Sequence, residues 1–132
     1  MIADQNRDDF RRGYAAVMAW ANAITENETE PGEFNPVEDA TAALGSDGLW
    51  HITADSVPGA DVVLDMTDAN AFMDEAADLL YASAESDWAQ HGHDFALTRN
   101  GHGAGFWDRG YGETGYELTG IAQRYAEAWV VL

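Results

Sequence analysis

Residues 93–109 read HDFALTRNGHGAGFWDR, and the structure assigned to them decides the fold. Phe95 and Leu97 alternate with polar or small residues, which is typical of a β-strand. Asn100-Gly101 is a strong signal for a two-residue β-turn. Phe106 and Trp107 would then lie on the returning strand. The segment therefore predicts a β-hairpin.

The residues after this hairpin predict a helix and a closing strand. Leu118 to Tyr125 has the spacing of a helix, and Ala128 to Leu132 is a short run rich in apolar residues. Residues 93–132 are therefore predicted to form a small antiparallel β-β-α-β sheet. We expect the helices of an acidic part, residues 1–92, to pack on it. The predicted fold class is α+β, in one domain spanning residues 1–132.

Helical spacing and turn signals predict the elements of the acidic part. The longest helix starts at Asp4, and its apolar stripe runs from Phe10 to Ile24. Glu26 to Pro36 is expected to be an acidic loop, and Ser46-Asp47-Gly48 a turn. Leu49 to Ile52 could be a strand or a hydrophobic anchor. Further helices are expected over Val37–Leu44, from Pro58 to about Ala82, and through Trp88 to a stop at Gly92.

Composition limits the class of protein. The 132 residues include five Trp, five Tyr and five Phe, which is typical of a folded protein and not of a disordered acidic tail. The absence of Cys excludes disulfides, thiol chemistry and cysteine-ligated zinc. The N-terminus lacks the pattern of a signal peptide, and no apolar run approaches the roughly 20 residues of a membrane span. We therefore expect a protein of the host cytoplasm that does not enter a membrane.

The charge is unevenly distributed along the chain. No Lys or Arg occurs between Arg12 and Arg99, although that segment holds seventeen carboxylates, and the net charge is −18. Such a field favours a basic partner, or a protein surface that normally holds DNA, and disfavours direct binding of nucleic acid. Adaptation to high salt is the main alternative explanation, although it should spread charge more evenly.

Two groups of carboxylates are candidates for binding a partner. Side chains four residues apart on a helix lie roughly 6 Å apart along its axis, which is comparable to the spacing of phosphates on a nucleic-acid strand. No Lys or Arg is placed in the sequence to neutralise the helical group. That group comprises Asp61, Asp65, Asp68, Asp74, Glu75 and Asp78. The second group lies in the acidic loop and comprises Glu26, Glu28, Glu30 and Glu33.

The stretch from His93 to Arg109 resembles a family signature. It is similar to the segment His-Asp-Phe-Trp-Leu-Thr-Arg-Asn-Gly-His-Gly-Ala-Gly-Phe-Trp-Asp-Arg of small, acidic, mostly uncharacterised proteins encoded by bacteriophages and mobile elements. Ala96 stands where Trp is usual in those proteins. The resemblance implies a phage or mobile-element origin and supplies no reaction.

The signature also carries polar side chains that could form a site. Its candidate residues are His93, Asp94, Arg99, Asn100, His102, Trp107 and Asp108. Arg99 is expected to pair with a carboxylate such as Asp108 across the hairpin. A metal could use His91, His93 and Asp94, or His102 with Asp108, but neither spacing matches a standard ligand pattern. We therefore expect no metal and no cofactor.

These patterns favour a non-catalytic function. The main hypothesis is an accessory protein that imitates DNA and occupies the DNA-binding surface of a host enzyme, such as a restriction, CRISPR or repair enzyme. One alternative is a small enzyme or ligand-binding domain organised around Arg99, His102 and Asp108. Another is a salt-adapted or structural phage protein. The sequence leaves open whether the protein is a monomer or a homodimer.

Overall fold

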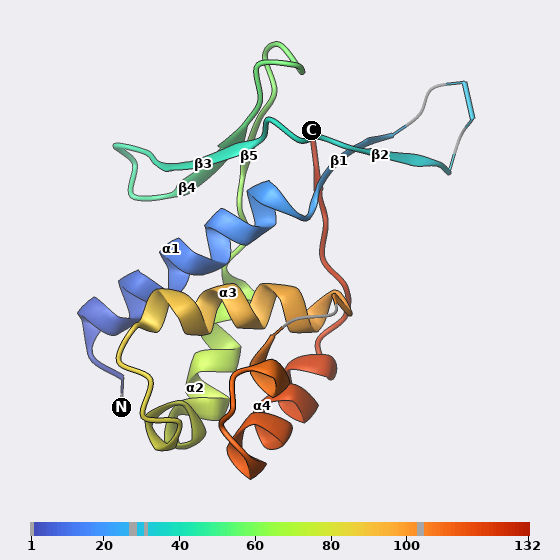
Figure 1. Cartoon of the computed structure of the whole chain (residues 1–132). Coiled ribbons are helices and arrows are strands. Elements are labelled where there is room, and N and C mark those ends of the chain that lie inside the picture. Colours follow the sequence, from blue (N-terminus) through green and yellow to red (C-terminus); the bar gives the residue numbers. More distant parts are fainter. Residues whose placement is uncertain (1, 27–28, 31, 103–104) are drawn as a thin grey trace. The chain divides into compact units, whose positions relative to one another are not determined.

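The computed structural model describes residues 2–26, 29–30, 32–102 and 105–132. Within them lie four α-helices, one 3-10 turn and two small three-stranded sheets, which confirms the α+β class (Figure 1). The chain divides into two compact units. The helical unit contains the residues up to Tyr14 together with Asp65–Glu127. The strand unit contains Ala15–Leu64 and Ala128–Leu132.

The helical unit is built around stacked aromatic rings. Phe10, Phe72, Phe95 and Phe106 are fully buried, and the ring centroids of Phe72 and Phe95 lie 4.3 Å apart. Burial of several aromatic side chains in one cluster is a large source of hydrophobic stabilisation. Its elements are α1 (Asp4–Trp20, as far as Tyr14), α2 (Thr67–Ala82), α3 (Trp88–Arg99), the 3-10 turn η1 (Phe106–Asp108) and α4 (Glu113–Gln123).

The predicted hairpin is wrong, because residues 88–99 form helix α3. The carboxylate of Asp87 caps its first turn by accepting a hydrogen bond from the backbone N–H of Ala89 at 3.1 Å. Asn100 ends the helix, and Gly101 follows with a φ of +70°, so the supposed turn signal is a helix stop. The residues of α3 from Asp94 to Arg99 are all buried, which removes the periodicity that separates a helix from a strand.

Helices α1 and α3 approach each other closely through two glycines. A Cβ added at Gly13 would lie 1.8 Å from the carbonyl oxygen of Ala89. A Cβ added at Gly92 would lie 1.9 Å from the carbonyl oxygen of Phe10. Only glycine permits this backbone-to-backbone approach. The expected helix stop at Gly92 is therefore a packing contact in the middle of α3.

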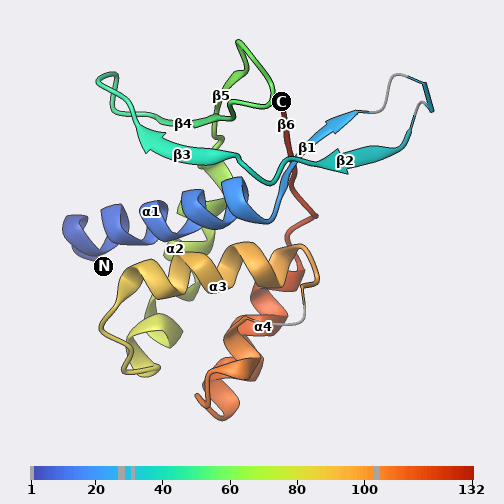
Figure 2. The same cartoon turned by 45° about the horizontal axis from the view of Figure 1, so that its top comes forward.

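The strand unit contains two three-stranded sheets, ordered β2-β1-β6 and β3-β4-β5 (Figure 2). In the first sheet, β1 pairs antiparallel with β2 and parallel with β6. In the second sheet, both pairs are antiparallel. The strands are β1 (Ala23–Glu26), β2 (Phe34–Pro36), β3 (Thr41–Leu44), β4 (Trp50–Thr53), β5 (Asp61–Val63) and β6 (Val130–Val131).

The structure corrects three further predictions about residues 26–82. The expected helix over Val37–Leu44 is wrong, because Thr41–Leu44 pairs with β4 through the predicted turn at Ser46-Asp47-Gly48. The expected helix from Pro58 starts only at Thr67, because residues 61–63 bond to β4 as strand β5. The acidic loop is partly strand, since β2 completes a hairpin with β1.

The predicted C-terminal sheet is also wrong. Phe106 and Trp107 belong to η1, and the segment that follows is helix α4. The terminal strand exists as β6, but it pairs with β1 from the beginning of the chain. No helix in the described ranges has both the length and the apolar character needed to cross a membrane.

Candidate functional site

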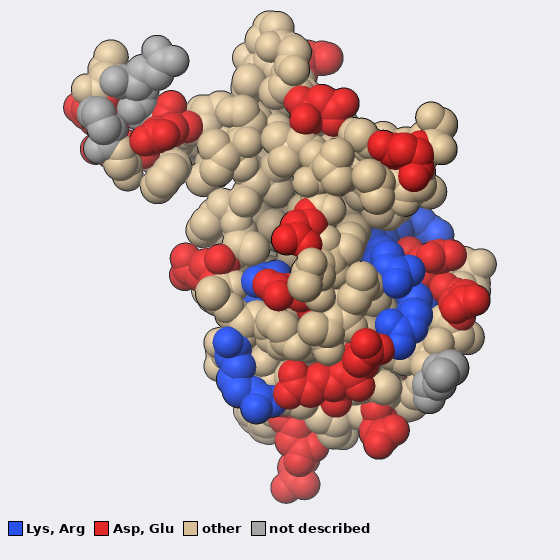
Figure 3. Space-filling model, turned by 180° about the vertical axis from the view of Figure 1, so that it is seen from behind, with Lys and Arg blue, Asp and Glu red and all other residues tan. Residues whose placement is uncertain are grey.

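All six arginines of the chain lie in the helical unit, and each forms an ion pair with a carboxylate of the same unit. Figure 3 shows the blue arginine side chains lying beside red carboxylates. The pairs are Arg7–Asp74, Arg11–Asp8 (3.1 Å), Arg12–Asp9 (2.7 Å), Arg99–Asp68 (2.6 Å), Arg109–Asp94 (2.8 Å) and Arg124–Glu75 (2.7 Å). Each arginine is therefore already paired with a carboxylate of its own unit.

Arg99 is the most deeply buried of these cations, and it does not pair with Asp108 as predicted. Its side chain is 3% exposed. The guanidinium donates to the Asp68 carboxylate at 2.6 Å, to the Tyr14 hydroxyl at 2.9 Å and to the Ala126 carbonyl oxygen at 3.0 and 2.7 Å. Because α3 is a helix, its last turn directs Arg99 between α1 and α2. This arginine holds the helical unit together and is not accessible to a ligand.

Arg109 and the buried Asp94 form an ion pair within the signature. The Asp94 carboxylate is fully buried and accepts hydrogen bonds from both the Nε and the Nη2 of Arg109, at 3.0 and 2.8 Å. The amide of Gln90 donates a third bond at 2.8 Å. The Asp94 bonds raise the pKa of Arg109. The pair ties η1 to α3, so the acidic and basic ends of the signature have a structural role.

These pairs overturn the expectation that the acidic helix face has no neighbouring cations. Asp68, Asp74 and Glu75 of α2 are each paired with an arginine. Asp78 is exposed on the same helix. The sequence could not show this, because each arginine comes from a segment at least 31 residues away.

The other two members of the predicted face lie outside helix α2. Asp65 precedes the helix and accepts a hydrogen bond from the backbone N–H of Thr67 at 2.9 Å. Hydrogen bonds from Thr67 lower the pKa of Asp65. Asp61 lies on β5 and belongs to the strand unit. The six carboxylates therefore do not form the single helical stripe that the sequence predicted.

The strand unit, in contrast, contains nine carboxylates and neither Lys nor Arg. The only side chain there that can become a cation near neutral pH is His51. Its Nδ1 lies 2.7 Å from the Asp61 carboxylate and its Nε2 lies 2.8 Å from that of Asp47. These two hydrogen bonds raise the pKa of His51. One imidazole thus joins β4, β5 and the turn between β3 and β4.

The β1–β2 hairpin carries most of the second predicted group. Glu26 ends β1 and is exposed, and Glu33 directly precedes β2. A hydrogen bond to the Glu30 carboxyl raises the pKa of Glu33, as expected where two carboxyl groups approach each other. Glu28 lies outside the described residues. The described members of this group therefore cluster on one hairpin.

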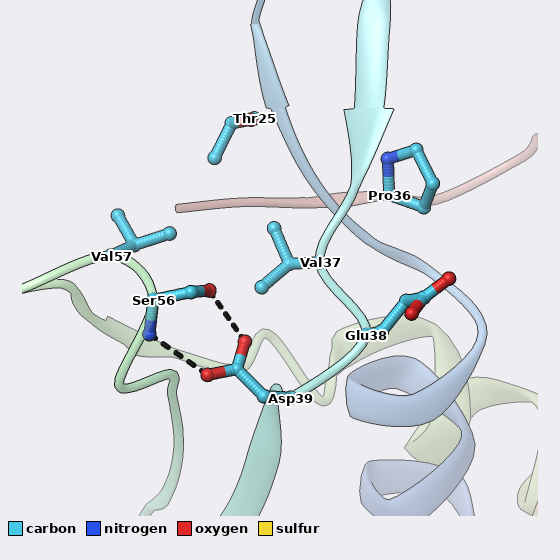
Figure 4. Close-up of a pocket in the computed structure, with 7 residues that line it drawn as sticks. All are labelled: Thr25, Pro36, Val37, Glu38, Asp39, Ser56 and Val57. Carbon is cyan, nitrogen blue, oxygen red and sulfur yellow. Dashed lines mark hydrogen bonds between the residues drawn. The ribbon is translucent and has the colours of Figure 1, made fainter.

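The strand unit also contains a shallow hollow of about 460 Å³ that the sequence did not indicate. Figure 4 shows Thr25, Val37 and Val57 around it, with Asp39 and Ser56 joined at one end. The Asp39 carboxylate accepts from the Ser56 hydroxyl at 2.5 Å and from the Ser56 backbone N–H at 2.8 Å. These bonds lower the pKa of Asp39. Pro36 and Glu38 complete the lining.

The remaining signature residues do not assemble into the predicted site. Asn100 caps α3, and Trp107 and Asp108 lie exposed on η1. His93 Nδ1 lies 3.8 Å from Asp94, whose carboxylate is already bound to Arg109. His102 follows the helix stop, and its backbone N–H donates to the carbonyl of Leu97. In the described part of the chain, no group of three or more His, Asp or Glu side chains is arranged to hold a metal.

Comparisons with known proteins identified no relative of this chain. No protein-family model, characterised protein or solved structure matches the chain. The resemblance of residues 93–109 to the phage-encoded family therefore stays a prediction.

Proposed function

We propose that the protein acts by binding a basic, DNA-binding protein of the host, and that the strand unit supplies the acidic surface that takes the place of DNA. A phage or mobile-element accessory protein that inhibits a restriction, CRISPR or repair enzyme would act in this way. The observation that carries the proposal is the partition of charge. Every arginine is bound to a carboxylate of the helical unit, whereas the strand unit has nine carboxylates without a Lys or Arg.

The physical basis is the cost of unneutralised like charges. Ion pairs in the helical unit reduce its field at short range, since each arginine lies within hydrogen-bond distance of its carboxylate. The carboxylates of the strand unit repel one another and attract cations from solution. A partner surface rich in Lys and Arg would relieve that repulsion and release bound counterions on both sides. Its association would be fast at low salt and would weaken as salt rises.

The location of the surface differs from the one that the sequence predicted. Three carboxylates of α2 already bind arginines and would have to exchange them for those of a partner. The strand unit has no arginine to exchange, and of its described carboxylates only Asp47 and Asp61 pair with His51. The residues proposed to face the partner are Glu26, Glu28, Glu30, Glu33, Glu38, Asp39, Asp47, Asp55 and Asp61.

The experiment compares two variants with equal net charge. One removes three strand-unit charges through Glu26→Gln, Glu33→Gln and Asp55→Asn. The other removes three exposed charges of the helical unit through Asp78→Asn, Glu113→Gln and Glu117→Gln. The immobilised proteins are exposed to bacterial lysate at low salt, and bound proteins are eluted with a salt gradient, identified and purified. Their dissociation constants are then measured.

The proposal expects a DNA-binding protein whose affinity falls at least tenfold between about 50 and 200 mM salt. The strand-unit variant should bind it several-fold more weakly than the helical-unit variant. Equal affinity of the two variants would contradict the proposed surface. Affinity independent of salt would contradict electrostatic imitation of DNA. Unfolding of the chain in dilute buffer, reversed by molar salt, would instead indicate adaptation to high salt.

A further inference from the structure

We propose that the hollow of the strand unit lined by Asp39, Ser56, Val37 and Val57 is a socket for one arginine side chain of the partner. This inference rests on the proposed function, which names the class of partner, and it adds the place and the chemistry of a specific contact. The hollow measures about 460 Å³, within the range of pockets that hold small ligands.

The anionic end of the hollow is held in place before any ligand arrives. Asp39 accepts two hydrogen bonds from Ser56, which lies seventeen residues away in the chain. These bonds fix the carboxylate between β2 and the segment that precedes β5. Each oxygen keeps a second lone pair that can accept from a cationic donor. A pre-positioned carboxylate loses little side-chain entropy on binding, which favours affinity and specificity.

The walls of the hollow suit the stem of a long basic side chain. Val37 and Val57 present methyl groups toward its centre, and Thr25 lies opposite Val37 (Figure 4). Arginine and lysine bury their methylene stems against apolar surface while the charged head reaches a polar partner. Glu38 lies at the rim, on the far side of Val37 from Ser56 (Figure 4). Its charge adds to the attraction without closing the entrance.

Arginine fits this combination better than lysine or a metal ion. A guanidinium is weakly hydrated and planar, so it can lie against the valine methyl groups and still donate to a carboxylate. The ammonium group of lysine is more strongly hydrated, so its transfer from water into the hollow would cost more free energy. A divalent cation needs several oxygen ligands, and this hollow offers two carboxylates that lie on different sides of Val37.

No arginine of the chain itself competes for the socket. All six are bound to carboxylates of the helical unit. The strand unit contains no Lys or Arg, and its own cation, His51, is held between Asp47 and Asp61. The arginine proposed to enter the hollow is therefore one from another molecule.

The test uses a short Gly/Ser peptide with one central arginine, together with the same peptide in which citrulline replaces arginine. Citrulline keeps the shape and removes the charge. Binding to the full chain is followed at low salt by the shifts of backbone amide NMR signals. The variants are Asp39→Asn and Asp55→Asn. Each removes one negative charge from one of the two loops that the Asp39–Ser56 contact joins, but only Asp39 lines the hollow.

The socket predicts signal shifts centred on Val37, Ser56 and Val57 with the arginine peptide and none with the citrulline peptide. Asp39→Asn should weaken binding about fivefold, and Asp55→Asn less than twofold. If Asp39→Asn alters the amide spectrum of the free protein broadly, Glu38→Gln replaces it, with a loss of about twofold expected.

The outcomes separate the socket from the proposed function. Equal weakening by Asp39→Asn and Asp55→Asn, or shifts spread over all the acidic turns, would overturn the socket and leave general attraction of basic partners intact. The result of the lysate experiment does not depend on the socket, because its variants change charges outside the hollow. Binding of the citrulline peptide with equal affinity would also overturn the socket, because the head group would then contribute nothing.

Discussion

Replacement of Arg99 by Met should strongly destabilise the helical unit. Met keeps an unbranched stem of similar length, so the change removes mainly the guanidinium. That group makes four hydrogen bonds between 2.6 and 3.0 Å from a side chain that is 3% exposed. It also lies over the rings of Phe95 and Tyr125, at 5.4 and 5.9 Å from their centroids.

The cost follows from the partners that remain after the replacement. The Tyr14 hydroxyl loses a charged donor, and Tyr14 is only 1% exposed. The Ala126 carbonyl loses one too, but Ala126 is exposed, so its carbonyl can bond to water instead. A buried polar group left without a partner costs about 1–3 kcal/mol. The Asp68 side chain is 47% exposed and can be hydrated once the guanidinium is gone, so its lost ion pair adds little to the loss of stability. We expect a loss of about 2 kcal/mol in the free energy of unfolding.

The assay is urea unfolding followed by far-ultraviolet circular dichroism, with Arg12→Met as the matched control. Arg12 is 57% exposed and pairs with Asp9 along one face of α1, a contact worth at most about 0.5 kcal/mol. If Arg99→Met cost less than about 1 kcal/mol, Arg99 would lie at the surface. The β-hairpin, with its Arg99–Asp108 pair, would then describe the segment better than helix α3.

Gly92→Ala should destabilise the protein by several kcal/mol in the same assay, because its Cβ would meet the Phe10 carbonyl at 1.9 Å. Gly120→Ala, in open space on α4, should instead stabilise by about 0.5–1 kcal/mol, and the opposite order would refute the α1–α3 packing. Asp87→Ala should cost about 1 kcal/mol by removing the cap of α3, whereas a neutral effect would argue against that helix start. The pKa of His51 is raised, so its stabilising bonds to two carboxylates are complete below about pH 6.5 and are lost as the pH rises through the folded pKa. An NMR titration of the His51 ring should show the raised pKa, and its return to an ordinary value in Asp61→Asn would confirm the cause.

The elements with clear periodicity and end signals were predictable from the sequence. Helix α1 shows an apolar stripe and is confirmed as far as Trp20, and the turn at Asp47 is also confirmed. Of the two interpretations left open for Leu49–Ile52, the structure shows the strand, β4. The C-terminal half of the predicted second helix matches α2. In both helices, one face is buried and the other is exposed, so the spacing of apolar residues predicts the helix.

The hairpin prediction failed for a physical reason. Helix α3 is buried on nearly all sides, so its apolar residues show no helical period. Asn100-Gly101 favours positive φ, which serves a helix stop and a β-turn equally well.

The contacts of the candidate site residues could not be predicted either, because they are made between segments far apart in the sequence. Which carboxylate receives each arginine depends on tertiary contacts such as Arg99–Asp68, and composition shows only the total charge. The Asp39–Ser56 contact joins two loops without any motif. The segregation of charge along the chain was visible, but the fold was needed to show that six of the fifteen carboxylates of the helical unit pair with arginine and that the strand unit contains no arginine to pair.

A competition experiment tests the acidic strand unit most directly as a substitute for DNA. A fluorescent DNA duplex is bound to the partner protein obtained from the lysate, and the full chain is titrated in while fluorescence anisotropy is recorded. The proposed function predicts that the wild-type chain displaces the duplex completely at low salt. The strand-unit variant should need several-fold more protein than the helical-unit variant of equal net charge. A ternary complex in which the duplex stays bound at saturation would contradict the claim.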